Sequence, residues 1–257
     1  MPLSPPASRN TLLSALSAND YALIERHLTR VPLPLRLSLQ NAGKMIEWVY
    51  FPEDGLGLVV ATESNGKQVE VGIFGKEGMS ATAVVLGADR SPHDVFMQIQ
   101  GVSGLRIAAK DLRDAMAASR SLHGLLLRYV QSMMIQSASS TSAAAGYMIG
   151  QRLARLLLMC HDRVAGDDIN LTHEFMSMML GSRRAGVTNA LQALEERCLV
   201  TVKRGCVLIG DRSGLERFAG SNYGIAEGEY ERLLKVPVQG VWPNGSSTKA
   251  DSTLTDI

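Results

Sequence analysis

The residues with the clearest chemical potential lie in the stretch SRRAGVTN, residues 182–189. Arginine can bond bidentately to guanine, asparagine can do the same to adenine, and alanine or threonine can pack on a thymine methyl group. Their spacing places them in the first turns of one helix. The N-terminal turns of a recognition helix are the part that contacts bases in the major groove. The predicted base-contacting residues are Arg183, Arg184, Ala185, Thr188 and Asn189.

The segment around this cluster has the pattern of a helix-turn-helix unit. Thr172 can cap a first helix that ends at Gly181, and Ser182 can cap a second helix. A small residue at Ser177, a glycine four residues later and Val187 six residues after that fit the spacing of such a unit. The side chains expected to face inward are Phe175, Met176, Met179 and Leu180 on the first helix and Val187, Ala190, Leu191 and Leu194 on the second.

A small hairpin, or wing, is predicted directly after the second helix. The sequence VTVKRGCVLI has two β-rich arms around Lys203-Arg204-Gly205, which would bring two cations to a phosphate backbone. Six Lys and Arg against three Asp and Glu between residues 181 and 212 make this surface basic, although the whole chain has a net charge of +1. The residues expected to contact the DNA backbone are Thr172, His173, Ser182, Lys203 and Arg204.

Composition limits the class of protein. A chain of 257 residues suggests one large domain or two ordinary ones, and 46% hydrophobic with 20% charged residues excludes a wholly disordered chain. No apolar run reaches the ~18 residues of a membrane span, and the first ten residues lack a secretory signal. Three scattered cysteines do not make a disulfide framework. We therefore expect a reduced, cytoplasmic protein with no membrane partner.

The N-terminal half is expected to be mostly β-structure. Residues 12–28 predict one or two short helices, and residues 33–107 predict roughly seven short strands. Asn65-Gly66 between two of these strands is a strong hairpin signal. This spacing favours a β-sandwich or jelly roll. The predicted strand segments are LPLRLSLQ, IEWVYFP, LGLVVAT, KQVEVGIF, ATAVVLG, DVFMQIQ and SGLRIA.

A helix of ~30 residues, ~45 Å long, is predicted from Lys110 to about Tyr147. It is longer than one small domain requires, and it carries an apolar stripe followed by small residues, SASSTSAAAG, that allow close helix approach. We expect it to pair with its twin in a homodimer; the alternative is a long core helix. The predicted dimer contacts are Leu122, Leu126, Tyr129 and Met133.

Over about residues 12–219, the chain resembles the Crp/Fnr family of bacterial transcription regulators. The similarity is most specific in QRLARLL (151–157), in residues 171–199 and in Ile209-Gly210-Asp211-Arg212 with Leu215, and it extends to FPEDGLGLVV, NGKQVEVGIFGKEGM and VFMQIQGVSGLRI. The resemblance implies an α+β fold of N-terminal β-roll or jelly roll, long dimerisation helix and C-terminal winged helix-turn-helix. The implied parts are a cyclic-nucleotide-binding-like sensory β-roll (12–109), the dimerisation helix (110–148), the DNA-binding domain (149–220) and an extension (221–257), disordered from about residue 236.

Departures from the family concern the ligand and the operator. Cyclic-nucleotide binders of the family carry a Gly-Glu pair and an Arg-Ser/Thr pair, whereas here only Arg90 and Ser91 match, as weak candidates for an unknown effector. Cyclic nucleotide is therefore not expected, and the absence of cysteine before Cys160 excludes the family's N-terminal iron–sulfur cluster. No cofactor or metal is predicted. Ala185 and Asn189 replace the Glu and the later Arg that read the best-known half-site, so the operator should differ.

The sequence therefore predicts a DNA-binding transcription regulator, a homodimer that reads a palindromic operator, with RNA polymerase as a further partner if it activates. An enzyme is not expected, because the strand region holds a lone histidine, His93, and no nucleophile elbow. Two alternatives stay open. One is a ligand-binding or scaffolding protein with a degenerate DNA module, and the other is a redox-responsive regulator that acts through Cys198 and Cys206.

Overall fold

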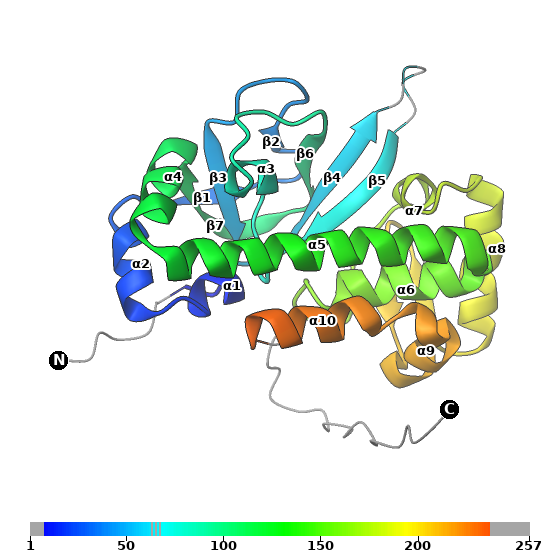
Figure 1. Ribbon diagram of the computed structural model, residues 1–257. Helices are drawn as coiled ribbons and strands as arrows, with labels where there is room; N and C mark the ends of the chain where they lie inside the picture. The colour runs from blue at the N-terminus through cyan, green and yellow to red at the C-terminus, as the bar shows by residue number, and fades with distance from the viewer. Residues whose placement is uncertain (1–7, 63, 65, 67, 237–257) are drawn as a thin grey trace.

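The computed structural model describes residues 8–236 except 63, 65 and 67, so the predicted disordered tail from about residue 236 lies almost wholly outside the described residues. A β-roll forms the N-terminal half, α5 (Arg120–Gly146) runs along it, and the predicted winged helix-turn-helix region lies at one end (Figure 1). This is the predicted α+β fold. Within the described residues, no helix is both long enough and apolar enough to span a membrane. The helices of the N-terminal half are α1 (Thr11–Ser14), α2 (Ala18–Glu25), α3 (Thr82–Val85), α4 (Ala109–Ala118) and α5 (Arg120–Gly146).

The β-roll consists of two antiparallel sheets. Its interior is filled by apolar side chains from both sheets and from the helices that cover them, among them the fully buried Phe51, Phe74 and Met79. β4 (Leu56–Thr62) and β5 (Gln68–Phe74) pair as the predicted hairpin up to Thr62 and Gln68. One sheet has the order β1 (Thr29–Leu33), β7 (Gly101–Ala108), β3 (Trp48–Pro52), and the other the order β2 (Ser38–Gln40), β6 (Asp94–Ile99), β4 (Leu56–Thr62), β5 (Gln68–Phe74).

Two predicted strands are wrong in detail. The segment LPLRLSLQ is divided between β1 and β2, which belong to different sheets, because Pro34 and the left-handed Arg36 (φ 63°) turn the chain between them. The segment ATAVVLG forms helix α3, which begins after a left-handed Ala81 (φ 56°). Val84 and Val85 of this helix lie in the same apolar cluster as α5, so burial explains their hydrophobicity without a strand.

The predicted single long helix is two helices, α4 and α5, separated at Ser119. This residue has an extended backbone (φ −132°, ψ 114°), and its side chain accepts the backbone N–H of Leu122 as the N-cap of α5. Ser119 and Ser121 also donate hydrogen bonds to the buried carboxylate of Asp20 on α2. The break is therefore built into the fold by a cap and a buried acceptor, two signals that helical periodicity does not report.

The predicted dimer contacts on α5 face inward. Leu122, Leu126 and Tyr129 are at most 1% exposed and belong to the core that α5 shares with the β-roll, and Met133 is half-buried beside them. This part of the prediction is wrong, because α5 uses its most apolar stripe to close the β-roll of its own chain. A seam between two copies would need another face of the helix.

The second half of α5 covers the free edge of the second sheet. β5 is the last strand of that sheet, so one row of its backbone groups has no strand partner. Gln136 Oε1 accepts the N–H of Ile73 at 3.0 Å, and Ser137 Oγ donates to the carbonyl of Val71 at 2.7 Å. Part of the small polar run on α5 thus satisfies a strand edge inside the chain.

Candidate nucleic-acid interface

The C-terminal half contains the predicted helix-turn-helix and wing. Its core is one apolar cluster that also includes residues of β4 and β5, so the unit packs directly on the β-roll. A two-residue strand, β8, adds a third strand to the predicted hairpin. The elements are α6 (Ile149–His161), β8 (Asp168–Ile169), α7 (His173–Leu180), α8 (Arg184–Glu196), β9 (Val200–Lys203), β10 (Cys206–Ile209), α9 (Arg212–Ala219), η1 (Gly220–Asn222) and α10 (Ile225–Leu234).

The turn between α7 and α8 has the predicted geometry. Thr172 Oγ1 accepts the N–H of Phe175 at 3.1 Å as the N-cap of α7, and Gly181 ends this helix in the left-handed conformation (φ 57°). Arg152 on α6 donates to the carbonyl of Leu180, the last residue of α7. Arg152 therefore ties the turn to the preceding helix. The local pattern of the turn gives no signal for this long-range contact.

The second helix begins two residues later than Ser182, the residue predicted to cap it. Arg183 occupies the N-cap position without a side-chain cap, and α8 runs from Arg184. The Ser182 hydroxyl donates back to the carbonyl of Leu180 at 3.3 Å and so is used in the turn. The free N–H groups at the start of α8 are consequently not covered by a cap side chain.

The two faces of α8 divide as predicted. Val187, Ala190, Leu191 and Leu194 are buried, and the helix lies so close to α6 that a Cβ on Gly186 would stand 3.2 Å from the side chain of Ile149. On the opposite face, Arg183, Arg184, Ala185 and Asn189 are exposed. Four of the five predicted base-contacting residues therefore present their side chains to solvent near the start of α8.

Thr188, the fifth, is half-buried and its hydroxyl is engaged within the protein. Its Oγ1 lies 3.1 Å from the carbonyl of Arg184 and 3.2 Å from Nδ1 of His173. The hydroxyl has one hydrogen, which the carbonyl accepts, so the imidazole N–H is the donor to Thr188. The methyl group is then the part of Thr188 available to a base, and His173 positions a neighbour instead of presenting a free imidazole.

The wing places its two cations differently. Lys203 Nζ lies 3.2 Å from a carboxylate oxygen of Asp168 on β8, with both side chains exposed. Arg204 is exposed at the turn, where Gly205 adopts the left-handed conformation (φ 74°). Arg204 is therefore better placed than Lys203 to meet a phosphate, because Lys203 already has an anionic neighbour.

Two further arginines of the predicted basic surface contact side chains of their own domain, although Arg197 stays exposed. The Arg197 guanidinium lies over the ring of Phe218, 5.1 Å from its centre. Arg212 binds the fully buried carboxylate of Asp162 at 2.7 Å, and this carboxylate also accepts the hydroxyl of Tyr223 at 2.8 Å. The charge count between residues 181 and 212 therefore overstates the basic surface by Arg212, whose charge is paired with a buried carboxylate.

The two cysteines of the redox-responsive alternative lie apart in the structure. Cys198 is exposed after α8, whereas Cys206 is half-buried near the wing turn, where it pairs with Lys203 in the hairpin. The two thiols therefore stand at opposite ends of the wing. Burial and a hydrogen bond with Asp168 raise the pKa of Cys206, which lowers its thiolate fraction.

The residues considered for an effector do not form a site in the β-roll interior. Arg90 is exposed and hydrogen-bonded to the neighbouring Asp89, and the hydroxyl of Ser91 accepts the N–H of His93. The interior itself is occupied, with the Tyr129 ring packed so tightly on Gly78 that a Cβ there would stand 2.2 Å from the Tyr129 hydroxyl oxygen. Across the described residues, no group of three or more His, Cys, Asp or Glu is arranged to hold a metal ion.

A cleft of about 1300 Å³ lies between the β-roll and the helix-turn-helix. One wall includes Thr172, Ser182 and Arg183, all predicted DNA contacts, and the other belongs to the β-roll, with Arg36 and Phe96 among its residues. The start of α8 therefore opens onto a space that the β-roll also bounds.

Comparison with known proteins agrees with this architecture. Residues 151–218 match the family model of the Crp-like helix-turn-helix domain. A comparison with curated proteins gives no significant match.

Among solved structures, the chain is similar to FixK2 from Bradyrhizobium japonicum, with a TM-score of 0.63 at 13% identity, over 76% of this chain and 98% of that one. It is also similar to a CRP-family transcriptional regulator from Thermus thermophilus, with a TM-score of 0.61 at 20% identity, over 75% and 97%. A third similar structure is the c-di-GMP-responsive regulator CLP from Xanthomonas campestris, with a TM-score of 0.59 at 16% identity, over 75% and 99%. The chain therefore has the fold of the solved Crp-family regulators, and its residues 151–218 form a Crp-like helix-turn-helix domain.

Proposed function

We propose that the protein binds a palindromic DNA operator as a homodimer, with α8 of each subunit in the major groove. In this proposal the β-roll (12–109) is the sensory part, the helices over 110–148 join two subunits, and residues 149–220 bind DNA. The observation that carries the proposal is the exposed start of α8, where Arg183, Arg184, Ala185 and Asn189 lie on the face opposite the core.

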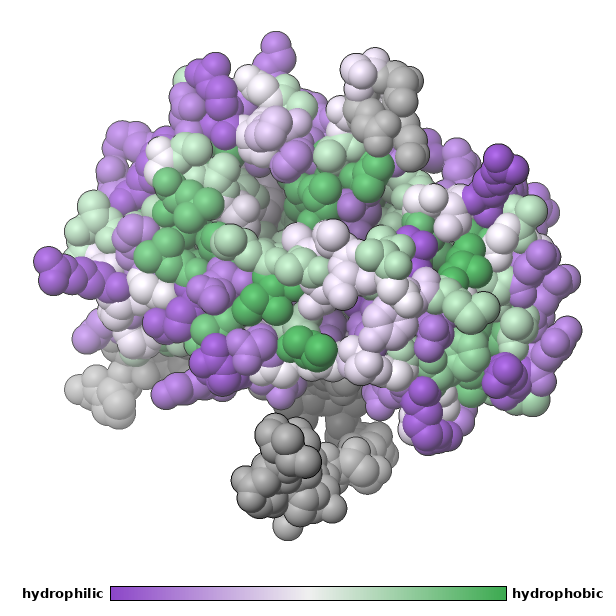
Figure 2. All heavy atoms as spheres, turned by 45° about the vertical axis from the view of Figure 1, so that its right-hand side comes forward, coloured by the Kyte–Doolittle hydropathy of each residue, from purple (hydrophilic) through white to green (hydrophobic). Residues whose placement is uncertain are grey.

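The dimer is proposed on a face of α5 other than the one first predicted. Small or apolar residues, with one glutamine, recur there at alternating intervals of three and four, the repeat of a two-helix coiled coil. Two of them, Leu127 and Met134, are 41% and 68% exposed although large and hydrophobic. A band of green to white side chains crosses the face shown in Figure 2, between purple hydrophilic regions. The series is Gly124, Leu127, Gln131, Met134, Ala138, Thr141 and Ala145.

This seam has room for a close helix pair. Its C-terminal half consists of Ala138, Thr141 and Ala145, whose small side chains let two backbones approach. The opposite face of α5 is occupied by the β-roll, so a second copy is the partner that matches a heptad repeat left open along a 27-residue helix.

The dimer is tested by replacing Leu127 and Met134 with glutamate. Four like charges at the seam of a symmetric pair should convert a dimer of twice 27.7 kDa into monomers, measured by light scattering. Ala144→Glu is the matched control, because Ala144 is exposed on the same helix but off the stripe. A monomeric wild-type protein at micromolar concentration, or dissociation by the control alone, would contradict the seam.

Operator binding is tested by selecting bound sequences from a randomised DNA pool. We expect an inverted repeat with half-sites about 34 Å apart, one helical turn, because a twofold dimer presents two α8 helices. Thr188→Val should keep the selected half-site, since it preserves the methyl group, whereas Thr188→Ser should relax one position. A pool without enrichment, or with asymmetric single sites, would overturn the proposal. RNA polymerase remains an expected partner only for an activator.

A further inference from the structure

The segment that follows the winged domain, Gly220–Leu234, lies outside the matched helix-turn-helix region and touches all three parts of the chain. Toward the DNA-binding domain, Asn222 donates to the carbonyl of Gln151 at 3.3 Å, and Tyr223 donates to Asp162 at 2.8 Å. α10 then runs beside α5 (Figure 1), where Arg128 donates to the carbonyl of Leu233 at 3.0 Å.

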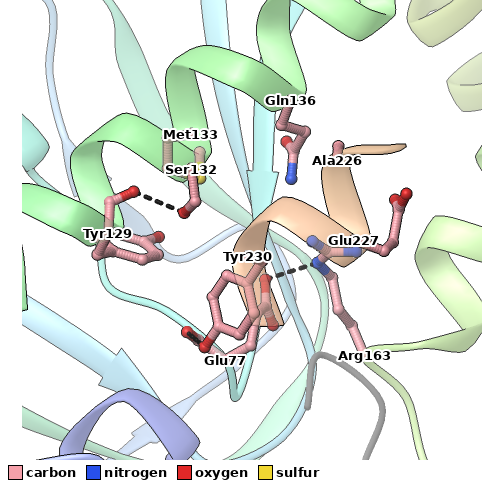
Figure 3. A pocket seen from close by; sticks show the side chains of 9 residues that line it. All are labelled: Glu77, Tyr129, Ser132, Met133, Gln136, Arg163, Ala226, Glu227 and Tyr230. Carbon is pink, nitrogen blue, oxygen red and sulfur yellow. Dashed lines mark hydrogen bonds and ion pairs between the residues drawn. The ribbon is translucent and has the colours of Figure 1, made fainter. Parts of the chain in front are cut away.

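The end of this segment reaches the β-roll at Glu77. The buried Tyr230 hydroxyl donates to the carbonyl of Glu77 at 2.5 Å, and the carboxylate of the same residue binds Arg163 at 2.7 Å. Tyr230 and Arg163 thus meet at one residue of the β-roll from two sides (Figure 3). Arg163 follows the end of α6, so this junction fixes the DNA-binding domain against the β-roll.

This orientation matters for the start of α8. Thr172, Ser182 and Arg183 line the cleft whose opposite wall is the β-roll. Because the β-roll forms that opposite wall, a duplex that approached these residues through the cleft would meet the sheet. An element that holds the two parts together therefore opposes full engagement of DNA.

We infer that α10 is an intramolecular clamp that keeps the DNA-binding domain in a low-affinity orientation, and that its release increases operator affinity. The inference rests on the proposed function and extends it to regulation by the chain's own C-terminal helix. The clamp depends on contacts that single substitutions can weaken or strengthen without a change in net charge, so its effect on DNA binding can be separated from electrostatics.

Two uncharged substitutions on α10 test this inference in opposite directions. Tyr230→Phe removes the hydrogen bond to Glu77 but keeps the buried ring, and it should raise operator affinity by up to about fivefold, the factor for one net hydrogen bond. Gly228→Ala should lower affinity by a similar factor, because alanine favours the helix and a Cβ at Gly228 meets nothing within 4 Å. Fluorescence anisotropy with the selected operator measures both.

Amide hydrogen exchange around Gly75–Gly78 provides a second readout that needs no DNA. Tyr230→Phe should accelerate exchange there and Gly228→Ala should slow it, while circular dichroism confirms the fold of each variant. Equal affinities for both variants, or changes of the same sign, would overturn the clamp. Failure of the wild-type protein to bind any DNA would count instead against the proposed function, and hydrogen exchange would still decide whether α10 restrains the junction.

Discussion

Arginine has opposite roles in two neighbouring regions of the C-terminal half. At the end of α6, Arg163 is 3% exposed and paired with Glu77, and Arg212 is paired with Asp162. At the start of α8, Arg183 and Arg184 stand on the surface. Arg163 joins the DNA-binding domain to the β-roll and Arg212 joins α9 to the end of α6, whereas the two arginines at the start of α8 are exposed to another molecule. Residue type is the same in both regions, so the environment decides the role.

The largest expected effect is on the buried junction. Arg163→Met leaves the Glu77 carboxylate buried without its partner and should lower the free energy of unfolding by about 3–5 kcal/mol, measured by urea denaturation. Arg184→Met should change it by less than about 0.5 kcal/mol, because that side chain is exposed. The double variant Arg163→Met/Glu77→Met should recover part of the loss. Equal losses at both arginines would remove the contrast between the regions.

A smaller effect on stability is expected from pH at the same junction. Burial raises the pKa of Glu70 on β5 from 4.5 to about 7, which the charges of Arg155 and Arg163 only partly oppose. Glu70 Oε1 and Arg155 Nη2 are both buried with no hydrogen-bond partner among the described residues.

The sign of this pH effect follows from proton uptake. Between pH 4.5 and about 7 the folded protein holds a proton on Glu70 that the unfolded chain has lost, so stability should fall as pH rises through this window and level off above it. One pKa unit corresponds to about 1.4 kcal/mol. Glu70→Gln should flatten the profile from thermal unfolding at several pH values; an unchanged slope would show that Glu70 does not titrate as described.

On the exposed side of the comparison, Arg184→Ala should weaken operator binding by ~1–3 kcal/mol and relax preference at one base pair per half-site. Arg197→Ala is the matched control, because it removes the same charge from a side chain stacked on Phe218. Binding titrations on operator and scrambled DNA measure both. If Arg184→Ala weakens the two DNAs equally, the residue contacts phosphate and does not read a base.

The smallest effect is expected at the wing. Arg204→Ala should weaken binding to all sequences about equally and lower the salt-dependence slope by about 1 for each phosphate that the arginine no longer neutralises. Lys203→Ala should have less effect, because Asp168 already lies 3.2 Å from its ammonium group. Titrations at several salt concentrations compare the two variants, and a change in sequence preference at either position would show that the wing reads bases.

The helix-turn-helix was predictable because its signals are local. Thr172, Gly181 and the inward residues of α8 act within one or two turns of the chain, and each has the predicted geometry or burial. The cap at Ser182 was not predicted correctly, since its hydroxyl has a competing acceptor at Leu180 that pattern reading did not weigh.

The role of α5 depended on tertiary structure. Its sequence carries two apolar stripes, one with Leu122 and Tyr129 and one with Leu127 and Met134. Helical periodicity alone predicts that the more apolar stripe forms the dimer contact. Only packing against the β-roll shows that the stronger stripe is used within the chain, leaving the weaker heptad series exposed.

The sequence by itself determined the order of parts, the exposed face of α8 and the hairpin between β4 and β5, because caps, turns and amphipathic spacing act between near neighbours. Tertiary structure decided which charges are buried, which stripe of α5 is open and where α10 lies. These properties depend on contacts such as Tyr230 with Glu77, 153 residues apart, and no spacing rule connects residues at that distance.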